Sequence, residues 1–264
     1  MTMKRIVALF LFLCLSIQSV RAQAFLPFEG PCPLAVMVET NPWLMVTGSD
    51  TPSFVLYEDG QVIFRKRSEK KSLVYLWKLL SPAELHSLKG KLTSFGPFRK
   101  AHTNIELTLA TDQPETKIFL NFKGAELSTS IYGINFANVS GQEERNKTPL
   151  PAKLRNLHAF LSSLEFTDAE EWKPKFIEII AWNYDHAVGA SISWPKHLPG
   201  LNSPTTIKTG NRYSIFVPGA ELKDVLAFLR TRTDKGAVEI DGKKFAVSVR
   251  PTFPSEPVWL KALF

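Results

Sequence analysis

The stretch Pro52–Arg65 constrains the fold more than any other part of the chain, because it predicts a β-hairpin. Phe54–Tyr57 is an apolar, β-prone run, and Val62–Phe64 resumes it after Glu58-Asp59-Gly60. An Asp-Gly pair suits a tight turn, since Gly adopts a positive φ without steric cost and Asp tolerates one. We therefore expect this hairpin at the centre of a first antiparallel sheet.

Two amphipathic helices are expected to pack on one face of that sheet. The first follows Ser81-Pro82-Ala83-Glu84, which has the spacing of a capping box with proline at the first helical position. The second opens at Pro151. Leucine and phenylalanine recur at helical spacing in both segments, at Leu85, Leu88 and Leu92 and then at Leu154, Leu157, Phe160, Leu161 and Leu164.

Further elements complete this first unit. Apolar runs predict strands at Leu73–Leu80, Ile105–Leu109, Lys117–Phe122 and Leu127–Tyr132, and a short edge strand at Leu34–Val38. Residues 138–148 are polar and predict a loop. Thr167–Glu170 repeats the capping-box spacing and predicts one short helical turn.

A second unit follows the junction Lys173-Pro174-Lys175. Phe176–Trp182 predicts a strand with Ala187–Trp194 as its candidate partner, and Pro195–Gly210 predicts a long loop. The remaining signals are a strand at Tyr213–Val217, a helix carrying Leu222, Val225, Leu226 and Leu229, and a second Asp-Gly hairpin over Val238–Val249.

Together these signals predict an α+β fold: antiparallel sheets with amphipathic helices packed on one face, in two similar units. The expected boundaries are residues 1–22 for a signal peptide, 23–170 for the first unit and 171–264 for the second. The shared order of strand, helix and strand pair leaves an internal duplication open.

The first residues have the three parts of a signal peptide. Lys4 and Arg5 precede the uncharged apolar run Ile6–Ile17. Ala22-Gln23-Ala24 matches the small-x-small rule for cleavage, and Val20-Arg21-Ala22 is a second acceptable site that would leave Gln23 as the first residue. The apolar run is shorter than the roughly 20 residues of a spanning helix, so cleavage is favoured over a membrane anchor. We expect a periplasmic or secreted protein with no membrane span after cleavage.

The net charge limits the classes of partner that we expect the chain to bind. The chain has 32 Lys and Arg against 25 Asp and Glu, a net charge of +7. Cleavage after residue 22 removes three basic residues and no acid, which leaves +4. The basic residues are spread along the chain, so we expect no nucleic-acid partner.

Cysteine content bears on disulfide bonding. After cleavage the chain keeps one cysteine, Cys32, which therefore has no partner for an intramolecular disulfide. We expect Cys32 to be buried.

The element order also resembles a known domain family. "FVLYEDGQVIF", "LSPAELHSLKGKL" and "LPAKLRNLHAFLSSL" resemble an exported bacterial domain family of unknown function. Its members read Y-x-D-G-x-V, then an L-S-x-x-E-L helix, then a strand pair and a closing helix. The resemblance covers roughly residues 52–166. It implies export and an α+β fold, and it implies no catalytic residue.

Candidate site residues gather between residues 182 and 197. They are Tyr184, Asp185, His186, Trp194 and His197. As metal ligands, Asp185 and His186 would point to opposite faces of a strand, and the spacing matches no standard zinc pattern. As a carbohydrate platform, Tyr184 and Trp194 lie near loops, whereas Trp182 ends an apolar strand and favours the core.

No sequence motif assigns a reaction. The chain has no G-x-S-x-G elbow and no glycine-rich phosphate loop, and Glu178 within an apolar run is explained by strand alternation as an outward residue. We therefore expect an exported, non-catalytic protein without metal or cofactor that binds a protein or glycan partner of the cell envelope or the extracellular space. The alternative is an envelope hydrolase or metal-dependent enzyme that uses residues 182–197.

Overall fold

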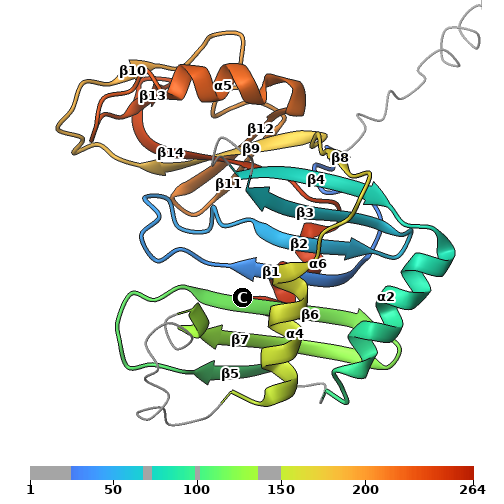
Figure 1. Cartoon of the computed structure of the whole chain (residues 1–264). Coiled ribbons are helices and arrows are strands. Elements are labelled where there is room, and N and C mark those ends of the chain that lie inside the picture. Colours follow the sequence, from blue (N-terminus) through green and yellow to red (C-terminus); the bar gives the residue numbers. More distant parts are fainter. Residues whose placement is uncertain (1–24, 68–72, 99–101, 136–149) are drawn as a thin grey trace, which may run out of the picture.

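The computed structural model describes residues 25–67, 73–98, 102–135 and 150–264. It shows an α+β protein with an eight-stranded and a six-stranded sheet, both mostly antiparallel (Figure 1). The α+β class expected from the sequence is therefore confirmed. The predicted signal peptide at residues 1–22 and the predicted loop at 138–148 lie outside the described residues.

The first sheet has the strand order β5-β7-β6-β1-β2-β3-β4-β8. β5 and β7 are parallel, and the other neighbours are antiparallel. The strands are β1 (Pro33–Glu39), β2 (Pro52–Tyr57), β3 (Gln61–Arg67), β4 (Leu73–Leu79), β5 (His102–Glu106), β6 (Glu115–Phe122), β7 (Ala125–Tyr132) and β8 (Glu170–Glu171).

The predicted hairpin is confirmed as β2 and β3, with Phe54 opposite Phe64 and Leu56 opposite Val62. Gly60 closes its turn with a φ of 89°. A Cβ on Gly60 would lie 2.9 Å from the carbonyl oxygen of Leu80. Glycine is therefore required here both by its backbone conformation and by the close approach of the chain that follows β4.

β1 is central, and the expectation of an edge strand at Leu34–Val38 is wrong. β1 lies between β2 and β6. Ala35 and Met37 belong to the core on one face of the sheet, and Val36 and Val38 belong to the core on the other. A strand covered on both faces reads as a continuous apolar run rather than an alternating one.

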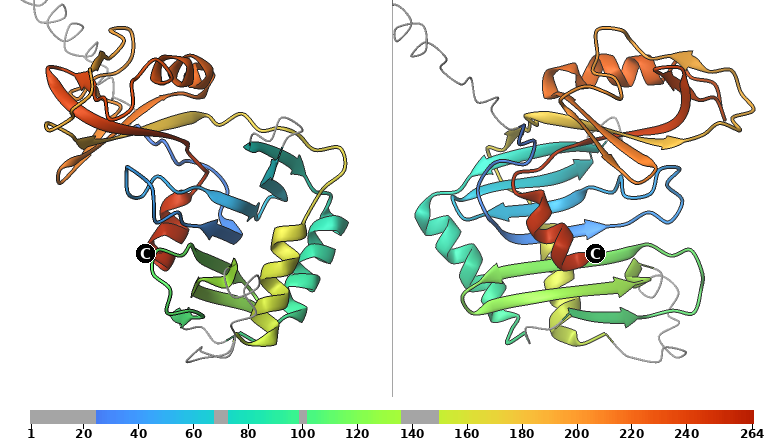
Figure 2. Two further views of the ribbon diagram at one scale, coloured as in Figure 1. Left: turned by 60° about the vertical axis from the view of Figure 1, so that its left-hand side comes forward. Right: turned by 180° about the vertical axis from the view of Figure 1, so that it is seen from behind.

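Two helices cover one face of this sheet, as expected. α2 (Pro82–Ser94) and α4 (Ala152–Ser163) lie side by side on it (Figure 2). The capping box is present: the Ser81 hydroxyl accepts from the Glu84 amide at 3.3 Å, and a Glu84 carboxylate oxygen accepts from the Ser81 amide at 2.7 Å. Buried leucines from both helices enter the same core, namely Leu88, Leu92, Leu154, Leu157 and Leu161.

The second sheet has the order β10-β13-β14-β9-β12-β11, with β10 and β13 parallel. Its strands are β9 (Phe176–Asn183), β10 (Ile192–Ser193), β11 (Thr206–Thr209), β12 (Arg212–Pro218), β13 (Val238–Ile240) and β14 (Lys243–Pro251). The short 3-10 helix η2 (Gly219–Glu221) leads into α5 (Leu222–Leu229), whose Val225 enters the core of this sheet.

Four local expectations are wrong. Ala187–Trp194 does not pair with β9, whose partners are β12 and β14. The expected loop Pro195–Gly210 contains β11. Thr167–Glu170 forms a turn and the start of β8 rather than a helical turn. β5 begins three residues before the expected strand at Ile105. Three of these differences depend on pairing with distant strands, whereas β11 pairs with β12 across the short turn that joins them.

The C-terminal helix α6 (Glu256–Leu263), which the sequence does not predict, returns to the first sheet. It packs on the face opposite α2 and α4, with Trp259 and Leu263 buried (Figure 2). Its last carbonyls are satisfied from that sheet. Lys117 Nζ donates to Leu263 O at 3.2 Å, and Ser128 Oγ donates to Ala262 O at 2.6 Å. The last element of the chain thus completes the first sheet.

Candidate functional site

Three of the predicted site residues lie in the turn that follows β9. The Tyr184 amide donates to the Lys244 carbonyl at 2.9 Å, and the Asp185 amide donates to Asn183 Oδ1 at 3.0 Å. Asp185 and His186 are exposed, and the His186 ring meets the edge of the half-buried Tyr184 ring at 5.0 Å between centroids. The turn therefore presents polar side chains to solvent.

The other two predicted residues, Trp194 and His197, differ in exposure. Trp194 is buried, donates from Nε1 to Pro199 O at 3.0 Å and packs on Phe228, so the expectation of an exposed platform at Trp194 is wrong. His197 is exposed. Trp182, expected in the core, is 43% exposed. Among the described residues no three His, Cys, Asp or Glu side chains come together as a metal site.

A groove opens beside this turn at the end of the second sheet, with a volume of about 290 Å³. We call it the lysine groove. Its lining residues are polar or aromatic and come from β9 with the turn after it, from β11 and β12 with the turn between them, and from β14: Asn183, Asp185, Lys208, Asn211, Tyr213, Lys243, Lys244 and Phe245. Of the predicted site residues, Asp185 is part of this lining.

Strand register brings these side chains together. Phe245 on β14 lies opposite Asn183 on β9, and Tyr213 on β12 lies opposite Lys208 on β11. The Tyr213 and Phe245 rings meet edge to face at 5.6 Å, and Lys208 Nζ lies 5.4 Å from the centre of the Tyr213 ring. Lys208 thus lies over the Tyr213 ring, which in turn packs against the buried Phe245.

The lysine groove is electropositive. Its lining residues include three lysines, Lys208, Lys243 and Lys244, and one acidic residue, Asp185. An arrangement with excess positive charge attracts anionic ligands over several ångströms. The sequence offered one signal for this site, the pair Lys243-Lys244 directly after the Asp241-Gly242 turn. It gave none for Lys208, which reaches the groove through strand pairing.

A buried charge cluster lies on the other face of the second sheet. The expectation that Glu178 faces outward is wrong, because its carboxylate is buried and lies 2.5 Å from Arg250 Nη2. Arg250 also pairs with Glu256 of α6, whose second carboxylate oxygen accepts from the Phe253 amide at 3.2 Å. Burial raises the pKa of Glu256, although Arg250 opposes that shift.

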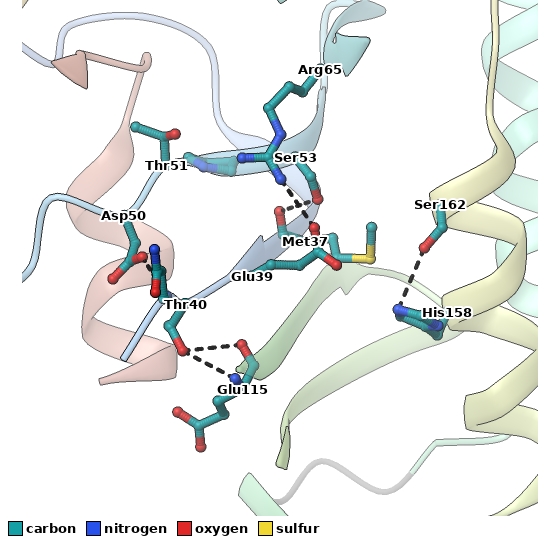
Figure 3. A network of polar contacts seen from close by, with 12 residues as sticks. Met37, Glu39, Thr40, Asp50, Thr51, Ser53, Arg65, Glu115, His158 and Ser162 are labelled. Atoms are coloured by element: carbon teal, nitrogen blue, oxygen red, sulfur yellow. Dashed lines mark hydrogen bonds and ion pairs between the residues drawn. The ribbon is translucent and has the colours of Figure 1, made fainter. Parts of the chain in front are cut away.

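A serine and a histidine meet on α4, where they could in principle act as a nucleophile and its base. Ser162 Oγ lies 3.4 Å from His158 Nε2 (Figure 3), at the long limit for a hydrogen bond. Burial lowers the pKa of His158, and the nearby charge of Glu39 opposes this. Glu39 is engaged by Arg65 at 3.0 Å. We therefore assign His158 and Ser162 a structural role in α4.

Cys32 is exposed, and the expectation that it is buried is wrong. Its amide donates to Glu58 Oε1 at 3.1 Å, so the backbone at Cys32 is tied to the turn of the β2–β3 hairpin. The thiol itself is left at the surface.

Among the described residues, no helix has the length and apolar character needed to cross a membrane.

Comparisons with protein-family models, with curated proteins and with solved structures gave no match to this chain. A function for the chain therefore has to be argued from the geometry and charge of the lysine groove.

Proposed function

We propose that this is an exported, non-catalytic protein that binds an anionic partner of the cell envelope or the extracellular space through the lysine groove. The observation that carries the proposal is that three lysines and a single acidic residue line one groove. The n-region, apolar run and small residues of positions 1–24 support export. The resemblance of residues 52–166 to an exported domain family is in keeping with it.

The chemistry of the groove favours an acidic glycan over a bare anion. Lysine amines offer flexible charged donors for carboxylate or sulfate groups. The amide side chains of Asn183 and Asn211 and the carboxylate of Asp185 add donors and acceptors that suit hydroxyl groups. A volume of about 290 Å³ lies at the small end for ligand pockets, which suits a short segment of a longer chain.

Isothermal titration with polygalacturonate tests the proposal, with dextran as the neutral comparison. The groove variant combines Lys208→Gln, Lys243→Gln and Lys244→Gln. Surface ion pairs are worth roughly 0.2–1 kcal/mol each, so losing three should weaken binding by about threefold to a hundredfold. Binding of polygalacturonate should also weaken as the salt concentration rises, since exposed charges are screened.

The matched control variant combines Lys123→Gln, Lys223→Gln and Lys261→Gln, three exposed lysines that do not line the groove and carry the same total charge. It should bind polygalacturonate almost as well as the unchanged protein. An equal loss of polygalacturonate affinity in both variants would show that binding depends on net charge and not on the lysine groove. Equal binding of dextran and polygalacturonate would overturn the proposal of an acidic glycan. Shortening of the polymer during incubation would favour the hydrolase alternative.

A further inference from the structure

A second hollow lies between the two sheets and is separate from the lysine groove. Its volume is about 270 Å³. We call it the inter-sheet cleft. It is bordered by the loop between β1 and β2, by β9, β12 and β14, and by α6. Ile180, Trp259 and Leu260 contribute to its apolar wall.

The charges on this wall do not balance. Arg250 is shared by the carboxylates of Glu178 and Glu256, so the buried cluster has one cation for two anions. Asp50 adds a third carboxylate to the lining and Arg212 adds a second guanidinium. With all five groups ionised, these lining side chains carry three negative and two positive charges, and the Lys117 amine, which also acts on Asp50, lies outside the lining.

Asp50 is the most accessible of these carboxylates. It is half-buried, whereas Glu178 and Glu256 are almost fully buried. Its Oδ1 accepts from the Asn41 amide at 2.8 Å. Burial raises the pKa of Asp50 even though Asn41, Lys117 and Arg250 act in the opposite direction. A cation that entered the cleft would offset the cost of keeping this carboxylate ionised.

We propose that the inter-sheet cleft binds a small organic cation with an apolar body, its ammonium or guanidinium group at Asp50 and its body against the accessible lining residues Leu260 and Phe264. The apolar wall gives the body a water-excluding surface, as in small-molecule sites whose few polar groups set orientation. Asp50 and the cluster behind it supply the anionic end. This site is independent of the proposed function and of the lysine groove.

Arg212 favours the competing class of ligand, small molecules with an anionic head group. Its Nη1 lies 3.0 Å from the position that a Cβ on Gly48 would occupy, so its guanidinium lies over the β1–β2 loop at the cleft. An anionic head group would pair with Arg212 and be repelled by Asp50. The charge preference of the cleft therefore separates the two classes.

Three probes that share an indole body test the charge preference by isothermal titration of the full chain: tryptamine, tryptophol and indole-3-propionate. We expect tryptamine to bind tightest and indole-3-propionate weakest. Asp50→Asn keeps an oxygen for the Asn41 amide and removes the charge, so it should weaken tryptamine binding by up to about fivefold. Tryptophol binding should stay the same.

Asp234→Asn is the matched control, because it removes an exposed carboxylate that does not line the cleft. It should leave tryptamine binding unchanged, and thermal melting should show that both variants fold. Equal binding of tryptamine and tryptophol, tightest binding of indole-3-propionate, or binding of none of the three probes would each overturn the proposal. Loss of polygalacturonate binding in the groove variant has no bearing on this result.

Discussion

At the scale of single residues, Arg250 holds the most consequential position in the second sheet. It is buried on β14 and pairs with Glu178 on β9 and Glu256 on α6. Strand alternation correctly separates Glu178 from the apolar face of β9. It cannot show that another sheet covers the remaining face, nor that the counter-charge comes from residue 250. A buried ion pair between distant positions leaves no local signal in the sequence.

Arg250→Met should destabilise the protein strongly, because it leaves two buried carboxylates without their cation. Breaking a buried pair from one side typically costs about 3–5 kcal/mol of the free energy of unfolding. Urea denaturation measures the change. Lys66→Met is the matched control, since Lys66 pairs with Glu165 at 3.1 Å in an exposed position. It should change the free energy by less than about 0.5 kcal/mol.

Similar losses of unfolding free energy in the two variants would show that burial does not make the Arg250 cluster more important for stability than an exposed ion pair. A loss confined to Lys66→Met would contradict the assignment of the cluster as a main support of the fold.

At the scale of elements, most local signals were reliable, although the capping-box spacing at Thr167–Glu170 formed no helical turn. The two Asp-Gly hairpins and the capping box of α2 each lie within a few residues, and all are present. The position of β1 within the sheet depends on β6, far along the chain, whereas β11 forms a local hairpin with β12 that was not predicted from the sequence. The lysine groove likewise depends on strand pairing, since its side chains come from separate strands.

Ser81→Ala tests the cap of α2. The Ser81 hydroxyl accepts from the Glu84 amide, and its loss should cost about 1 kcal/mol of the free energy of unfolding. Ser87→Ala is the control, because Ser87 is exposed within the same helix, where alanine is a better helix former than serine. Denaturation midpoints should fall for the first variant and not for the second. An unchanged midpoint in Ser81→Ala would remove the energetic role of the cap.

At the scale of the whole molecule, the order of elements along the chain does not follow their packing. The sequence predicts two units, 23–170 and 171–264, and each sheet does form from one of these ranges, apart from the last residue of β8. α6 lies in the second range and packs on the first sheet. Near the other end, Phe25 and Phe28 pack on Phe216 of β12. Both ends of the described chain thus contact the sheet built from the other range.

These crossings predict that the two sheets unfold together. Val46, from the loop between β1 and β2, is buried with Ile180 and Ala246 of the second sheet, and Glu256 joins α6 to Arg250. Calorimetry of residues 23–264 should therefore show one transition whose calorimetric and van't Hoff enthalpies agree. Hydrogen exchange should give the slowest amides of β6 and β12 the same free energy of opening.

Trp259→Ala probes this coupling through α6, because Trp259 is buried against the first sheet while its helix begins at the Arg250 cluster. Removing a buried tryptophan side chain typically costs about 3–5 kcal/mol, and the loss should lower the opening free energy of β6 and β12 alike. Protection lost in β6 alone, or two resolved transitions in the unchanged protein, would show that the sheets are independent. The inter-sheet cleft would then lie between two separately folding parts.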